Sequence, residues 1–432
     1  MIPTDNIPDR SKAPRQGKQI KLPLKDPIYM PLDNGLDAFA IHAGEQEVTR
    51  IDIIFKAGTA LQKKKLTASA TGKLIKEGTR TYSSAQIAGQ LDYVGAYCDV
   101  NTSKDSSTLT LYSLTRHLEK LMPLIVDMIS NATFPEQELT TYLDRKRQEF
   151  VINSEKVRYR AMLEFNRLLF GDTSAYGQIL ELGDFDRLSR EDLDEYYHAN
   201  FTAGNAYLIV SGKADEKVLA LVNKTLGNGF IPYAGIAPRV NYIGANGTRE
   251  HFIEKKGALQ SAIRIGRPVF NKMHPDYHKF ILLNTVLGGY FGSRLMSNLR
   301  EDKGYTYGVT SSHYNYLHGA AFSVATEVNA VHTRSAIEEI FREMKRLQEE
   351  EVSREELDMV KNYIYGTFLR NFDGPFALAD RFRSAHDFGL GFDYYLDSLN
   401  QLMSVTAGDL LETANKYLRR DEMICLVVGS YN

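Results

Sequence analysis

Two side chains suited to holding a carbonyl oxygen or an anion lie seven residues apart in the second half of the sequence. They are Arg300 and Tyr307, in the segment LREDKGYTYGV. A guanidinium and a phenolic hydroxyl are both hydrogen-bond donors, and the guanidinium is always charged. A helix-like segment with Leu295 and Leu299 on one face surrounds the arginine, and Gly304 is placed to end it. The pattern predicts a polar site at the end of a short helix.

Three glycines stand just before this helix. Gly288, Gly289 and Gly292 follow an apolar run. They could permit close approach of a backbone, or of a carboxylate bound at the helix N-terminus. They could equally meet a steric demand of the loop itself. The spacing does not decide between these two interpretations.

Other groups of reactive residue types have plainer structural explanations. His274 and His278 have the four-residue spacing of two metal ligands on one helix face, but no glutamate lies between them and a proline does. We expect a capped helix start with solvent-facing histidines there. Ser69 and Lys73 could form a Ser-Lys nucleophile pair, yet no oxyanion-binding signal accompanies them. The lysine run 63–65 is expected to be a solvated loop rather than a phosphate site.

The length and composition set limits on these chemistries. A chain of 432 residues is expected to form two or three domains. Its net charge of −2 gives no sign of nucleic-acid or membrane binding. No apolar run approaches 18 residues, so no transmembrane helix is expected. The start of the chain lacks the apolar core of a secretory signal, so we expect a cytoplasmic protein, or a periplasmic one if a signal peptide was removed.

The two cysteines carry little functional information. Cys98 and Cys425 are far apart and lie in apolar or aromatic surroundings. We expect two buried thiols, with a single disulfide as the alternative.

The elements that must position these residues can be read from periodicity and turn signals. The dipeptide Asn34-Gly35 predicts a hairpin turn between two strands. Further strands are predicted at 50–58, 107–114 and 206–212, and helices at 66–76, 84–94 and 118–129. Pro135 opens what reads as one long charged helix to about residue 170.

The order of elements recurs in the second half of the chain. Leu139, in FPEQELTTYLDRKRQEF, aligns with Leu357, in VSREELDMVKNYIYGTF, at an offset of 218. Asp192, after a Ser-x-x-Asp capping pattern, aligns with Asp409 at an offset of 217. Two matches at nearly one offset indicate an internal duplication. Long helices segregated from antiparallel-type strands favour an α+β fold.

The duplication divides the chain into four parts. A proline-rich extended arm is expected at 1–28. The first unit is predicted at 29–215 and the second at 240–432. A linker region rich in Gly and Pro is predicted at 216–239. A turn at 373–375 is expected to lead into a helix, with no chemical role assigned to it.

Two tandem α/β units with LREDKGYTYGV in the second resemble the pitrilysin/insulinase family of zinc metallopeptidases. That family includes the mitochondrial processing peptidases and the core proteins of the respiratory cytochrome complex. The resemblance covers about residues 30–432 and rests also on YHANFTAGNAYLIVSG and FGDTSAYG. It implies an α+β fold of two homologous tandem units of the processing-peptidase type, each a mostly antiparallel sheet backed by helices.

The zinc motif of that family is degenerate in this chain. Family members carry H-x-x-E-H on a helix of the first unit, and a further glutamate on the next long helix. The equivalent segment is LTASATGKLIKEGTRTYS, where K-E-G-T sets the register. The motif positions become Ser69, Ala70, Thr71, Gly72 and Lys73. None of these side chains replaces a neutral imidazole, and an ammonium would oppose a divalent cation. Glu149 and Glu155 lie near the expected third ligand, but neither aligns with it, so the resemblance implies no zinc on this chain.

The motif of the second unit is intact. The family pattern L-R-x-x-x-G-x-x-Y matches residues 299–307. The resemblance implies that Arg300 and Tyr307 hold the substrate backbone and polarise the scissile carbonyl beside a partner's zinc. The segment GGYFGSR stands where processing peptidases have a glycine-rich loop implicated in handling substrate. This makes Gly288, Gly289 and Gly292 candidates for substrate binding.

Some bacterial members of the family divide these duties between two chains. We therefore expect a non-metal, substrate-binding subunit of a heterodimeric zinc endopeptidase, with the zinc on a homologous partner chain and no cofactor of its own. Its substrate would be an unfolded peptide, bound by strand addition to a sheet edge. The alternative is a non-catalytic structural or peptide-binding scaffold, possibly a homodimer. A hydrolase that uses other residues is the third interpretation.

Overall fold

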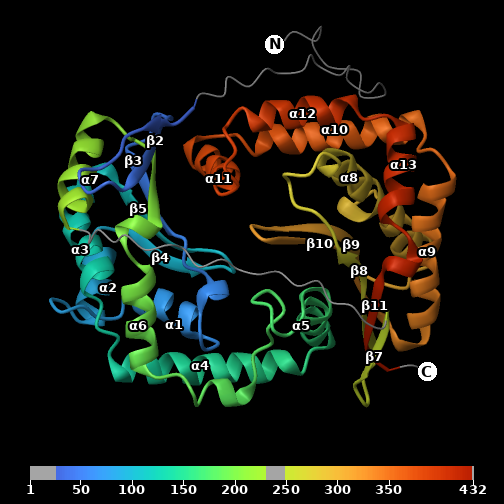
Figure 1. The fold of residues 1–432 in the computed structure, drawn as a ribbon, viewed down its shortest axis with the longest axis horizontal. Coiled ribbons are helices and arrows are strands. Elements are labelled where there is room, and N and C mark those ends of the chain that lie inside the picture. The colour runs from blue at the N-terminus through green and yellow to red at the C-terminus, as the bar shows by residue number, and fades with distance from the viewer. Residues whose placement is uncertain (1–25, 230–248, 431–432) are drawn as a thin grey trace, which may run out of the picture.

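The computed structural model describes residues 26–229 and 249–430 (Figure 1). The predicted N-terminal arm therefore lies almost wholly outside the described residues. Its last predicted residue, Ile28, belongs to a strand instead, because it pairs with Ala40 at the edge of the first sheet. Among the described residues, no helix is both long enough and apolar enough to cross a bilayer.

The first sheet has six strands in the order β1-β2-β6-β3-β5-β4. Neighbouring strands are antiparallel except β2 and β6. The bounds are β1 (Ile28–Tyr29), β2 (Asp37–His42), β3 (Val48–Phe55), β4 (Tyr97–Thr102), β5 (Ser107–Leu114) and β6 (Ala206–Gly212). The predicted turn joins β1 to β2, with Gly35 at a φ of +80° and the Asn34 side chain accepting from the Leu36 amide.

The second sheet repeats this order, and residues 249–430 contain no equivalent of β1. Its order is β7-β11-β8-β10-β9, and only β7 and β11 run parallel. The bounds are β7 (Glu250–Glu254), β8 (Gln260–Pro268), β9 (Val309–Tyr316), β10 (Gly319–Asn329) and β11 (Ile424–Gly429). The parallel pair, the central antiparallel strands and the final hairpin therefore recur in one sequence, as expected of a duplicated α+β unit.

Helices back each sheet, and each unit has its own apolar core. The first unit contributes α1 (Thr67–Leu74), α2 (Ser84–Tyr93), α3 (Leu118–Asn131), α4 (Glu136–Ser154), α5 (Val157–Phe170), α6 (Arg190–Asn200) and α7 (Glu216–Gly229). The second contributes α8 (Tyr277–Asn284), α9 (Thr333–Glu349), α10 (Arg354–Arg370), α11 (Pro375–His386), α12 (Tyr394–Ser404) and α13 (Ala407–Tyr417).

The expected linker is wrong over its first part. Helix α7 occupies 216–229, and Val218, Val222 and Leu226 are buried in the core of the first unit. These residues recur every four positions, so they form an apolar stripe that must be covered. Residues 230–239 lie outside the described residues.

The predicted long helix after Pro135 is also wrong, because it is two helices. Lys156 has an extended backbone between α4 and α5. The break lets α5 turn away and pack Phe165 and Leu169 against Ala262 and Leu426 of the second sheet. The expected turn at 373–375 is confirmed, and it starts the corresponding helix α11.

Helix α11 makes the reciprocal contact. It packs Ala379 and Phe382 against Ile54 and Ile209 of the first sheet. Figure 1 shows α5 beside the second sheet and α11 beside the first, so each unit lends one helix to the other. Burial of these apolar faces stabilises the two units as one body.

Polar contacts reinforce this seam. Buried Arg50 pairs with Asp52 at 2.7 Å in its own unit and with Asp380 of α11 at 2.5 Å. The Tyr207 hydroxyl donates to Asp387 at 2.5 Å. Both cysteines, Cys98 and Cys425, are free and buried, as expected.

Candidate functional site

The segment that carries Arg300 is an unusual helix in the second unit. Two short π-helices, Thr285–Gly289 and Met296–Asp302, flank the glycine loop. Leu295 and Leu299 are fully buried, which confirms their shared face. Gly304 ends the segment with a φ of +65°, as expected. Single π-turns are rare and recur at functional sites, because they shift side chains out of the α-helical register.

Steric constraints account for the three loop glycines to different degrees. A Cβ at Gly288 would lie 2.7 Å from the Ser311 backbone nitrogen of β9, so this position admits no side chain. At Gly292 a Cβ would lie 2.9 Å from the ring of Tyr290. Gly289 is exposed, with its nearest neighbours at 3.2 Å or more. A role in substrate binding stays a prediction for all three.

The side chains of Arg300 and Tyr307 are largely uncommitted. The guanidinium carbon of Arg300 lies 4.5 Å from the ring centroid of Phe291, a cation–π contact. Its Nη1 is buried and has no acceptor among the described residues. Tyr307 is 95% exposed, on the connection from the π-helix into β9. The Arg300 guanidinium is therefore held by ring stacking rather than by an acidic partner among the described residues, and it keeps its charge beside the exposed Phe291.

A polar clamp fixes the π-helix from behind. The Asn298 amide donates to Glu339 at 3.1 Å and to Glu343 at 2.8 Å. Both carboxylates are buried on α9, and they also accept from Arg342 and Arg346. Asn298 lies two residues before Arg300, so its hydrogen bonds fix the backbone from which the arginine side chain extends. These bonds were not predicted from the sequence, although glutamates four apart beside the apolar stripe of α9 were a usable signal.

A second anchor ties the same segment to α10. Arg294 donates from Nε and Nη2 to the two oxygens of Glu356, at 2.9 and 2.8 Å. Such a bidentate pair has a fixed geometry. The Nη1 of Arg294 is buried and lacks an acceptor among the described residues.

The degenerate motif positions of the first unit lie on α1, where they make ordinary structural contacts. Ser69 donates to the Leu66 carbonyl at 3.0 Å. A Cβ at Gly72 would lie 2.5 Å from Thr102 Oγ1 of β4, so the helix packs tightly on that strand. Lys73 pairs with Asp99 of β4 at 2.7 Å. Partial burial opposes ionisation of Asp99, but the hydrogen bond and charge of Lys73 together with the charge of Lys76 outweigh it and lower the pKa of that carboxyl.

Neither candidate for a third zinc ligand faces this helix. Glu149 pairs with Lys146 on the exposed side of α4, at 2.6 Å. Glu155 pairs with Lys255 of the second unit at 2.8 Å. The residues present at this place do not fit a zinc ion, since they offer one lysine–carboxylate pair and no imidazole. Within residues 26–229 and 249–430, no three His, Cys, Asp or Glu side chains are grouped as metal ligands would be.

The histidine pair was expected to face solvent, which is wrong for His278. This side chain is buried at the start of α8, and burial lowers its pKa. His274 stacks on Phe270 at 4.0 Å and accepts from the Asp276 amide. The spacing of the pair therefore serves the helix start.

The lysine run after the first strands is tied to α6 and its approach. Lys63 pairs with Glu195, Lys64 with Asp192 at 2.8 Å, and Lys65 with Asp184 at 3.2 Å. With acidic partners already in place, these cations do not form an anion-binding cluster.

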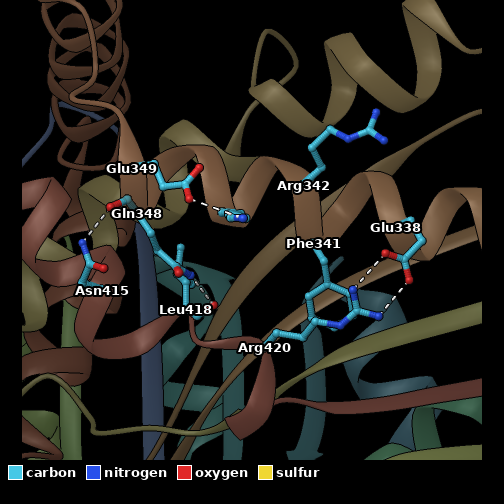
Figure 2. A pocket seen from close by; sticks show the side chains of 9 residues that line it. Glu338, Phe341, Arg342, Gln348, Glu349, Asn415, Leu418 and Arg420 are labelled. Atoms are coloured by element: carbon cyan, nitrogen blue, oxygen red, sulfur yellow. Dashed lines mark hydrogen bonds and ion pairs between the residues drawn. The ribbon is translucent and has the colours of Figure 1, made fainter.

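A groove between α9 and α13 is a rival site, but its groups are already paired. Figure 2 shows Arg420 joined to Glu338 by two hydrogen bonds, at 2.9 and 2.8 Å. The same guanidinium lies 4.4 Å from the ring centroid of Phe341. Asn415 donates to the Gln348 carbonyl at 2.9 Å. These contacts hold the two helices together and leave the pair near the glycine loop as the stronger candidate.

Comparison with known proteins assigns both halves of the chain to related families. Residues 40–168 match the family described as "Insulinase (Peptidase family M16)". Residues 187–364 match the one described as "Peptidase M16 inactive domain".

Curated relatives carry both kinds of name. The chain is 23% identical over 364 residues to "Uncharacterized zinc protease YmxG" of Bacillus subtilis, covering 82% of this chain and 86% of that protein. It is 21% identical over 391 residues to "Non-peptidase homolog YmxG" of Helicobacter pylori, covering 88% of each.

Solved structures support the fold. A peptidase M16 inactive domain from Pseudomonas fluorescens superimposes with a TM-score of 0.84 at 21% identity, over 94% of this chain and 98% of that one. A protease from Helicobacter pylori superimposes with a TM-score of 0.85 at 18% identity, over 94% and 100%.

Proposed function

The chain belongs to the peptidase M16 (insulinase) family, and we propose that it is the non-metal, substrate-binding subunit of a heterodimeric zinc endopeptidase. One contrast carries the proposal. Lys73 and Asp99 pair where the family has zinc ligands, while Arg300 has a nitrogen without an acceptor among the described residues and Tyr307 is 95% exposed. The charges of the first arrangement are already paired, whereas the second consists of donor side chains suited to an oxygen-bearing ligand.

The chemistry follows from the donor types. Arg300 would hold a backbone carbonyl of the peptide, since its guanidinium is charged at every relevant pH. Tyr307 would donate to the scissile carbonyl oxygen as negative charge develops on it. The partner's zinc would supply the activated water. The hydrogen bonds from Asn298 to Glu339 and Glu343 fix the backbone next to Arg300 against α9.

The test is reconstitution with a zinc-bearing homologue encoded in the same genome. We expect neither chain alone to cleave an unfolded peptide, and the mixture to do so. Arg300→Ala should lower kcat/KM of the mixture by about 10²-fold or more. Arg354→Ala is the matched control, because this exposed arginine of α10 lies outside the proposed site. Turnover that survives Arg300→Ala unchanged would contradict the proposal.

A scaffold without chemistry is the second candidate. One specific observation favours it: a relative covering 88% of this chain is named a non-peptidase homolog. The chain would then pair with itself or bind peptides without cleaving them. The native mass separates the two functions, because a self-dimer that ignores the zinc-bearing homologue supports the scaffold.

A further inference from the structure

Three exposed apolar side chains and the half-buried Tyr290 gather near Arg300 on the second unit. The glycine loop supplies Tyr290 and Phe291, and α10 supplies Met359 and Tyr363; we call these four the aromatic face. Phe291, Met359 and Tyr363 are 65%, 57% and 44% exposed. The Tyr290 ring lies 5.1 Å from that of Tyr363, and its hydroxyl lies 3.8 Å from the Met359 sulfur. Exposed aromatic and Met side chains in one place are typical of binding surfaces.

A cationic side chain borders this face. The guanidinium carbon of Arg300 lies 4.5 Å from the ring centroid of Phe291. Arg294 is committed to Glu356, one helical turn before Met359, and holds the loop against α10. The charge of Arg300 beside apolar rings favours a ligand with both apolar area and an oxygen acceptor.

The first unit shows that the fold does not require this face. Helices α4 and α10 align at the offset of 218, since the buried Leu139 and Tyr142 match the buried Leu357 and Val360. At that offset Met359 corresponds to Thr141, and Tyr363 corresponds to Arg145. Both residues of α4 are exposed and polar. The apolar pair is thus a property of the second unit alone.

We propose that the aromatic face binds an extended peptide through one large apolar side chain, aromatic by preference, while Arg300 donates to one of the peptide's carbonyl or carboxylate oxygens. The inference rests on the proposed function, because it names the substrate class of the same site. A second copy of the chain is the weaker occupant. Four side chains expose much less than the roughly 800 Å² that each partner of a stable dimer buries.

The test uses the full chain and two blocked, fluorescein-labelled decapeptides of Gly and Ser. One carries a single central Phe and the other carries Ala at that position. Fluorescence anisotropy should give about tenfold tighter binding of the Phe peptide. The double variant Met359→Thr/Tyr363→Arg, which installs the residues of the first unit at exposed positions, should abolish this preference. Tyr93→Ala removes an aromatic that is 82% exposed on α2 and should preserve it.

Other outcomes either overturn the inference or separate it from the proposed function. Equal binding of the two peptides removes the preference, and an equal loss with Tyr93→Ala makes it non-specific. If the chain forms a dimer, binds neither peptide, and the double variant is monomeric, then the aromatic face binds a second copy of the chain. If Arg300→Ala leaves the turnover of the reconstituted enzyme unchanged while the preference for the Phe peptide persists, the proposed function is wrong. Peptide binding by the aromatic face is then still supported. If turnover depends on Arg300 but no preference exists, only the aromatic face fails.

Discussion

The two units use the same device to begin one pair of equivalent helices. Asp192 of α6 and Asp409 of α13 each complete a capping box at the third helical position. Each carboxylate also pairs with a lysine, Lys64 at 2.8 Å and Lys279 at 2.7 Å. The strand orders match as well. Features that hold the fold therefore recur in both units.

Features that could do chemistry do not recur. Helix α1 of the first unit is held against its sheet by close packing at Gly72 and by the Lys73–Asp99 ion pair. The segment after α8 in the second unit instead carries Arg300 and the part of the aromatic face formed by Tyr290 and Phe291. A duplicated scaffold can thus keep its packing in both copies while each copy presents different side chains.

The largest stability effect should come from the clamp of Asn298 with Glu339 and Glu343 in the second unit. Asn298→Ala removes two hydrogen bonds to buried carboxylates. We expect a loss of about 3 kcal/mol in the free energy of unfolding, because bonds to charged groups contribute roughly 1.5–3 kcal/mol each. Urea unfolding followed by circular dichroism would measure it.

The control for this clamp is Asn415→Ala. That amide also donates to two oxygens, but both are exposed backbone carbonyls. Its loss should cost about 0.5 kcal/mol or less. Equal costs for the two variants would mean that the buried carboxylates do not depend on Asn298.

A medium effect tests whether the glycine loop is built for packing or for ligands. Gly288→Ala would push a Cβ against the Ser311 backbone, so we expect a loss of about 2 kcal/mol. Gly366→Ala in α10 is the matched variant, because nothing lies within 4 Å of its Cβ. It should be neutral or stabilise by about 0.5 kcal/mol, as glycine is a poor helix former. A neutral Gly288→Ala would favour a ligand role over packing.

The smallest effect tests the shared device. Asp192→Ala and Asp409→Ala should each cost about 1 kcal/mol, and the two losses should agree closely. Chiefly the hydrogen bond from Lys279 lowers the pKa of Asp409 to about 2, from a usual 3.8. Its contribution should be full above pH 4 and should vanish as the pH falls towards 2. Unequal losses at pH 7 would mean that the units are less alike than their registers indicate.

Much of the fold could be predicted from local patterns in the sequence. The strands 107–114 and 206–212 have the predicted bounds, because alternation and a continuous apolar run are local patterns. The duplication is visible at the level of strand order. The split between α4 and α5 was missed, since no Gly or Pro marks Lys156. The break is set by the contact that α5 makes with the other unit, which no local pattern encodes.

The candidate site could likewise be predicted only in part. Residue types and spacing selected Arg300 and Tyr307. They could not reveal the buried carboxylates Glu339 and Glu343, because long-range burial decides whether a glutamate on a helix faces water. The burial of His278 escaped for the same reason.

The most direct test of the contrast compares one variant from each unit in the reconstituted enzyme. Tyr307→Phe removes only the hydroxyl of an exposed side chain, and Lys73→Met removes the charge that fills the degenerate motif. We predict that kcat falls by about 10²-fold for Tyr307→Phe and stays unchanged for Lys73→Met. Unchanged kcat for Tyr307→Phe, or an equal fall for Lys73→Met, would contradict the assignment of chemistry to the second unit.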